Sequence, residues 1–86
     1  MDNLPCLQLA RYAAEQGGSA PAILNAVNEV AVDAFLDESI TFTNIPNVIN
    51  QVFDELPLCH IESIEDVLQI DNEARVLAVK ALESLN

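Results

Sequence analysis

The chain has 86 residues, of which fourteen are acidic and three are basic, so its formal net charge is −11. This length allows one small domain. Because 51% of the residues are apolar, the composition excludes a disordered acidic tail. Contacts with phosphate groups need Lys or Arg, so the charge also argues against nucleic acid and anionic membrane surfaces as partners.

The cysteines and the N-terminus indicate a cytoplasmic protein. Cys6, Cys59 and the single histidine, His60, supply at most three ligands, whereas a structural zinc ion takes four. The N-terminus is acidic and no apolar run follows it, unlike a signal peptide. No segment reaches the roughly 18–20 apolar residues that cross a bilayer. We therefore expect a cytoplasmic chain whose two cysteines are reduced and mostly packed.

Gly and Pro divide the first half of the chain into two helical segments. The first predicted helix runs from about residue 5 to residue 16, and Gly17-Gly18 ends it. The second follows Ser19, a favourable N-cap residue, has Pro21 in its first turn and continues to residue 36. Apolar residues occupy nearly its whole circumference, which is typical of a buried central helix.

The third helix has the most regular pattern. A connector over residues 37–43 precedes it, and Ile40 and Phe42 are the apolar anchors of that connector. From Ile45 to Leu56, apolar residues recur at spacings of three and one, while the opposite face is polar. Pro57 follows the end of this helix.

The last part of the chain predicts two helices. Ser63 followed by Asp66 resembles a capping box, which begins a helix with an apolar edge over residues 64–68. Asp71 interrupts that edge, and the apolar stripe resumes after it in a new phase. We therefore expect a break at Asp71. The predicted fold class is all-α, a small bundle of four main helices plus one short helix.

Three polar residues stand out on the second predicted helix. Spacings of three and four place Asn25, Asn28 and Glu29 on one face of an otherwise apolar helix. A carboxamide-rich face with one carboxylate has no nucleophile and no base to complete an active site. Buried amides need partners, so we interpret Asn25, Asn28 and Glu29 as a domain-contact or structural polar face.

Other motifs lack the partners that chemistry requires. His60 lies beside Cys59, but adjacent side chains seldom face each other and no third group orients them. The run Asp71–Glu73 has neither the spacing nor the glycine of a calcium loop. Gly17-Gly18 lacks the lysine of a phosphate-binding loop. The sequence therefore predicts no catalytic, cofactor-binding or metal-binding residue.

An acidic helical carrier is the alternative class. Acyl carrier proteins attach their prosthetic group to a serine that opens a helix, and Ser63 stands in a similar run from Glu62 to Leu68. Carriers place that serine near mid-chain, whereas 62 residues precede Ser63. The capping box also explains Ser63 without a prosthetic group. The alternative function is thus a free-standing interaction or carrier module with Ser63 as its pantetheine site.

A set of short motifs spans residues 4–82. The central motifs are Gly17-Gly18, Ala20-Pro21-Ala22, Leu24-Asn25-Ala26, Asn28-Glu29-Val30-Ala31-Val32 and Ala34-Phe35-Leu36. The flanking motifs are Pro5-Cys6-Leu7, Leu9-Ala10, Ile40, Phe42, Ile45-Pro46, Asp66-Val67-Leu68, Asp71 and Ala74-Arg75. In order and spacing these motifs resemble the C-terminal region of the 1-deoxy-D-xylulose 5-phosphate reductoisomerase family.

The resemblance implies that residues 1–86 are a single helical C-terminal domain, a fragment of a longer enzyme whose NADPH-binding and catalytic domains are absent here. That family converts its substrate to 2-C-methyl-D-erythritol 4-phosphate in non-mevalonate isoprenoid biosynthesis, with NADPH and a divalent metal, Mg or Mn. Its cofactor, metal and phosphate-binding segments lie upstream, so no such residue carries over and we expect this fragment to be inactive. The implied partners are the catalytic domain of its own chain and, in the full enzyme, a second copy in a homodimer.

Overall fold

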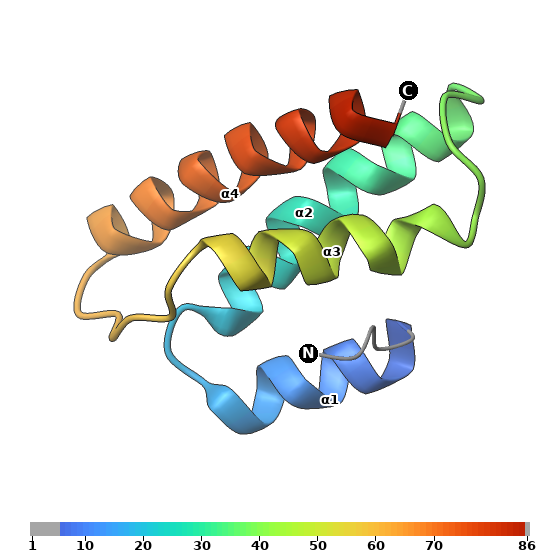
Figure 1. The fold of residues 1–86 in the computed structure, drawn as a ribbon. Coiled ribbons are helices and arrows are strands. Elements are labelled where there is room, and N and C mark those ends of the chain that lie inside the picture. The colour runs from blue at the N-terminus through green and yellow to red at the C-terminus, as the bar shows by residue number, and fades with distance from the viewer. Residues whose placement is uncertain (1–5, 86) are drawn as a thin grey trace.

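The computed structural model describes residues 6–85, and within this range the chain forms four helices and no strand (Figure 1). The helices are α1 (Cys6–Gln16), α2 (Ala20–Leu36), α3 (Asn44–Glu55) and α4 (Ile64–Leu85). The prediction of a small all-α bundle is confirmed. The predicted start of the first helix at residue 5 lies outside the described residues.

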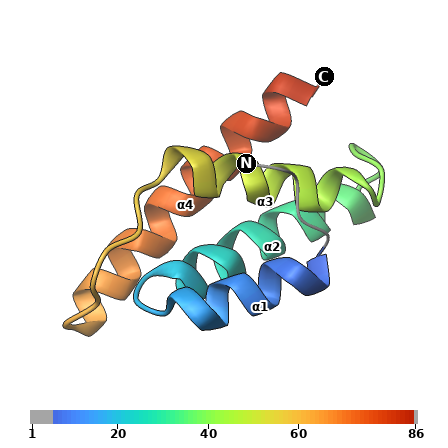
Figure 2. The ribbon, with the colours of Figure 1, turned by 60° about the horizontal axis from the view of Figure 1, so that its bottom comes forward.

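The second helix is central, as its apolar circumference predicts. α2 packs against α1, α3 and α4, and its contacts with them are the most extensive of any described helix. Figures 1 and 2 show α1 and α4 on different sides of α2, with α3 crossing the bundle beside both α2 and α4. The rings of Tyr12 and Phe53 meet edge to face at a centroid distance of 5.3 Å, which ties α1 to α3.

The core is built from apolar side chains of all four helices. On α3, every residue of the predicted apolar stripe is buried, from Ile45 to Leu56, so that prediction is confirmed. On α4, Ala74, Ala78 and Ala81 form a fully buried stripe at spacings of four and three. Small side chains at a contact let two helix axes approach closely, which explains why α4 can lie along α2.

One end of the bundle is held by a pair of hydrogen bonds that we call the clasp, between Ser19 and Cys59. The Ser19 N–H donates to the Cys59 carbonyl oxygen at 2.9 Å. In return, the Cys59 N–H donates to the Ser19 hydroxyl oxygen, also at 2.9 Å. Ser19 is fully buried and its side chain makes no capping bond to α2. Ser19 thus occupies the predicted N-cap position of α2, but its hydroxyl does not cap the helix, because it accepts from the α3–α4 connector instead.

The two glycines before the clasp have different tasks. Both have positive φ angles, +64° at Gly17 and +55° at Gly18, so both use the left-handed region that glycine enters without steric cost. The Gly17 N–H donates to the carbonyl oxygen of Ala13 and ends α1, as predicted. A Cβ atom at Gly18 would lie 2.6 Å from the Cys59 carbonyl oxygen, so the clasp requires glycine there.

The predicted break at Asp71 is wrong, because α4 is a single helix from Ile64 to Leu85. Asp71 does not cap a new helix; its carboxylate accepts a hydrogen bond from Arg75 one turn later, at 2.8 Å. The apolar edge that suggested a separate helix is also not part of the core, since Ile64 and Leu68 are 78% and 64% exposed. An exposed edge does not have to stay in phase with the buried stripe that follows.

Two expectations about single side chains also need correction. Ile40 is buried as predicted, but Phe42 is 65% exposed, and its ring meets that of Phe35 edge to face. Cys59 is exposed rather than packed, because the clasp uses its main chain and leaves the thiol outside. The side chain of Cys6 lies outside the described residues.

Ser63 is expected to matter for stability through its position at the start of α4. Its hydroxyl accepts from the Asp66 N–H at 3.2 Å, and the Asp66 carboxylate accepts from the Glu62 N–H at 3.0 Å. Replacing Ser63 by Ala should lower the free energy of unfolding by about 1 kcal/mol, as the loss of an N-cap usually does. Urea unfolding followed by helical circular dichroism measures this, with Ser84→Ala as the control because Ser84 bonds only within α4. Equal losses in the two variants would contradict the capping role.

Candidate functional site

The structure separates the three residues that the sequence placed on one polar face of α2. Asn25, Asn28 and Glu29 are all exposed. Glu29 turns to α4, where its carboxylate accepts a hydrogen bond from Arg75. Asn25 and Asn28 instead line a hollow on the side of α1. The domain-contact role of this face therefore stays a prediction, and its two carboxamides are the residues to which it now applies.

Arg75 joins α2 to α4 through two carboxylates. Its Nε atom donates to Asp71 at 2.8 Å, and its Nη2 atom donates to Glu29. These two hydrogen bonds raise the pKa of Arg75 above its ordinary value, so the guanidinium keeps its charge throughout the accessible pH range. This ion pair was not among the features predicted from the sequence. The spacing of Asp71 and Arg75 on one helix was a usable signal, whereas the approach of Glu29 depends on how α2 and α4 pack.

The second feature is a hollow of about 440 Å³ beside Asn25 and Asn28, which we call the α1–α2 groove. It is lined by Ala10, Ala13, Ala14, Pro21, Leu24, Asn25, Asn28 and Ile49. Its walls are mostly apolar side chains of α1 and α2, several of them short, and Ile49 of α3 also lines it. Neither carboxamide has a hydrogen-bond partner among the described residues. The groove combines an apolar surface with two polar groups that are able to bind something outside the domain.

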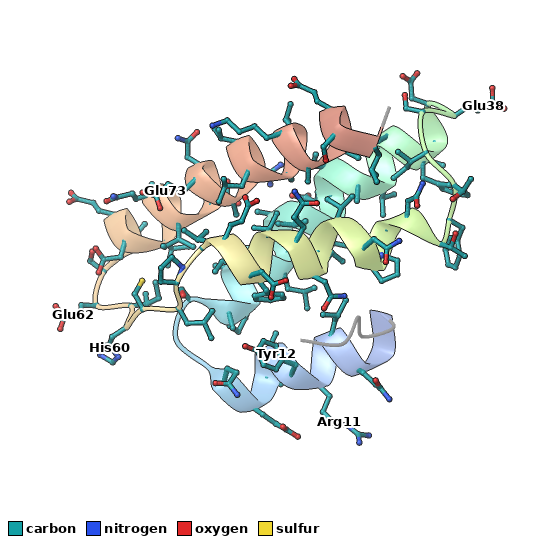
Figure 3. All side chains as sticks on the ribbon, viewed as in Figure 1. Arg11, Tyr12, Glu38, His60, Glu62 and Glu73 are labelled. Carbon is teal, nitrogen blue, oxygen red and sulfur yellow. The ribbon has the colours of Figure 1, made fainter. Side chains whose placement is uncertain are left out.

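The residues around Cys59 and His60 do not form a reactive site. Cys59, His60 and Asp66 border a small hollow of about 150 Å³, but Asp66 already accepts the Glu62 N–H at the start of α4. Figure 3 shows His60 and Glu62 pointing outward from the connector. Within residues 6–85, no three His, Cys, Asp or Glu side chains come together in a way that could hold a metal ion.

None of the helices in the described part of the chain is long and apolar enough to cross a membrane. The hydroxyl of Ser63, the residue on which a carrier function would depend, is engaged with the Asp66 N–H. The local geometry thus supplies a structural reason for this serine.

Known proteins match this chain over nearly its whole length. The model of the DXP reductoisomerase C-terminal domain family matches residues 1–77. The 1-deoxy-D-xylulose 5-phosphate reductoisomerase of Shewanella frigidimarina is 48% identical over 85 residues, covering 99% of this chain and 22% of that protein. The enzyme of the same name from Pseudomonas syringae pv. syringae is 53% identical over 77 residues, which are 90% of this chain and 19% of that protein.

A solved structure shows the same fold. It is described as the 1-deoxy-D-xylulose 5-phosphate reductoisomerase from Zymomonas mobilis in complex with NADPH, and it superposes on 91% of this chain with a TM-score of 0.86 at 44% identity. The match covers 21% of that protein, so this chain spans about a fifth of the length of the relatives it matches. These matches do not support the carrier alternative. The chain belongs to the DXP reductoisomerase C-terminal domain family.

Proposed function

We propose that this chain serves as the C-terminal helical domain of a reductoisomerase that converts 1-deoxy-D-xylulose 5-phosphate to 2-C-methyl-D-erythritol 4-phosphate in non-mevalonate isoprenoid biosynthesis. The observation that carries the proposal is the agreement of sequence and fold with reductoisomerases over nearly the whole chain. The groove and the ion pair fit a supporting role, since neither contains a nucleophile and a base in contact.

The described residues do not fit either NADPH or a divalent metal. NADPH carries several phosphate charges, and a phosphate site needs basic groups or clustered backbone N–H donors. Of the few basic side chains, Arg75 is already paired with two carboxylates, and Arg11 points away from the bundle (Figure 3). We therefore propose that NADPH and the metal, Mg or Mn, bind to the rest of the enzyme, and that this domain takes no chemical step.

The partner in this proposal is the catalytic part of the same enzyme chain, and the full enzyme is a homodimer assembled through that part, as the resemblance implies. We propose that it works in the cytoplasm, for which the free and exposed thiol of Cys59 is the supporting observation. Analytical ultracentrifugation of the full enzyme should give the mass of two chains; the mass of one chain would contradict the dimer.

Activity measurements on the chain and on a chimera test the proposal. The purified 86-residue chain should oxidise no NADPH when given the substrate and Mg or Mn. A chimera of the Shewanella frigidimarina enzyme, with this chain in place of its own C-terminal domain, should be active, while the same enzyme without a C-terminal domain should lose most of its activity. Turnover by the chain alone, or an inactive chimera that is folded, would contradict the proposal.

A further inference from the structure

We infer that the α1–α2 groove receives an extended segment of the catalytic part of the enzyme, and that Asn25 and Asn28 bind the main chain of that segment. This inference rests on the proposed function and assigns the contact to one face of the bundle. Four observations support it: the shape of the groove, its two carboxamides, the distribution of charge and the length of the relatives.

The shape of the groove suits a polypeptide backbone. Ala10, Ala14 and Pro21 are exposed and line its walls with short side chains. A backbone approaches closely only where the surface has no long side chains in its way. The volume of about 440 Å³ is in the range of binding clefts, and its apolar walls provide a surface from which a partner excludes water.

The two carboxamides suit the polar groups of the same backbone. Each Asn side chain offers an N–H donor and a carbonyl acceptor, which is the pair that a peptide unit needs. Within the described residues, Asn25 and Asn28 bond to nothing else. By contrast, Glu29 is engaged with Arg75 and is not needed for the contact. An extended segment has unpaired peptide groups to offer, whereas a helix has satisfied its own.

Charge distinguishes this face from the rest of the molecule. Between residues 6 and 28, which comprise α1, the turn after it and the first half of α2, the charged side chains are Arg11 and Glu15, and they cancel. Residues 29–85 carry twelve acidic and two basic side chains, a formal net charge of −10. The centres of protein interfaces are depleted of charged residues. The groove therefore lies on the neutral side of an otherwise strongly acidic domain.

The occupant is a segment of the enzyme rather than a second copy of this domain. Bringing two domains together would bring two strongly negative bodies together, which is unfavourable. Moreover, about four fifths of each relative's length lies outside the region matched here, and the matching family is a C-terminal domain. The remaining length of such a chain is tethered to this domain, so a segment of it is present at high effective concentration.

Thiol labelling of single cysteines tests the inference. Ala14→Cys places a thiol on the groove wall, and Ser84→Cys places a matched thiol on α4, a helix that does not contact α1. Each variant is made in the 86-residue chain and in the chimera, and N-ethylmaleimide labelling is read from the individual peptides by mass spectrometry. The groove thiol should react about tenfold more slowly in the chimera than in the chain, while the control thiol should keep its rate.

The outcomes separate the groove from the proposed function. An active chimera in which the Ala14→Cys thiol reacts as fast as in the chain would overturn the groove assignment and leave the function standing. If the Ala14→Cys thiol of the 86-residue chain is labelled more slowly as the chain concentration rises, a second copy of the domain covers the groove. That result would overturn the assignment of the groove to a segment of the catalytic part.

A second variant tests the carboxamide. Asn28→Leu in the chimera should lower the melting temperature and leave KM for the substrate unchanged. Combined with Ala14→Cys, it should also return the labelling rate of the groove thiol toward the rate measured in the 86-residue chain. The matched control is Asn72→Leu, which changes an exposed Asn on α4 and should affect neither reading. A raised KM with unchanged melting would show that Asn28 binds the substrate rather than a chain segment, and would overturn the inference.

Discussion

Replacing Gly18 by Ala is expected to lower the free energy of unfolding by about 2–4 kcal/mol, a large share of what a small domain has. Two costs combine in this variant. An Ala residue at a φ of +55° is strained by about 1–2 kcal/mol. Its Cβ would also lie 2.6 Å from the Cys59 carbonyl oxygen, so the two hydrogen bonds of the clasp must lengthen or break.

The neighbouring glycine provides the control for this experiment. Gly17 has nearly the same φ angle, +64°, but a Cβ atom there meets nothing within 4 Å. Gly17→Ala should therefore cost only the strain, about 1 kcal/mol. Urea unfolding of the two variants measures the difference. If the two variants lose the same free energy of unfolding, the close approach of Gly18 to the Cys59 carbonyl oxygen does not contribute to stability.

Replacing Ile23 by Ala is expected to cost about 2–5 kcal/mol. Ile23 lies on α2, is fully buried and ranks among the largest fully buried side chains of the described residues. Its removal leaves a cavity in a central helix that packs against α1, α3 and α4, so the surrounding side chains cannot close it without moving the bundle. Urea unfolding, or the melting temperature at constant protein concentration, gives the loss.

The adjacent leucine separates burial from residue type. Leu24 is half-buried and lines the α1–α2 groove, so Leu24→Ala removes about the same number of atoms but leaves no closed cavity. We expect it to cost roughly 1–2 kcal/mol. A cost at Leu24 as large as that at Ile23 would show that the core extends into the groove.

Periodicity predicted those parts of the fold in which a helix face is buried along its whole length. The stripe of α3 predicted a buried helix face, and the apolar circumference of α2 predicted a central helix. Both predictions are confirmed. The same reasoning failed at Asp71, because it treated the exposed Ile64 and Leu68 as core residues. A pattern of apolar residues does not tell which of them the bundle covers.

Contacts between residues far apart in the chain could not be predicted from the sequence, for a different reason. The clasp joins residues 40 positions apart, and Glu29 meets Arg75 across 46 positions. Neither contact follows from local spacing, because each depends on the packing of whole helices. Asn25, Asn28 and Glu29 were found from their polarity on an apolar helix, but only the packed structure separates the carboxamides from the carboxylate.

The clasp also bears on the order in which the molecule folds. A contact across 40 residues closes a long loop, and the chain entropy lost in doing so has to be recovered by the contacts inside that loop. α2 and α3 lie inside it and pack on each other, so their pairing shortens the distance that Ser19 and Cys59 must cross. We therefore expect α2 and α3 to pair before the clasp closes and fixes the turn that leads from α1 and the connector that leads into α4.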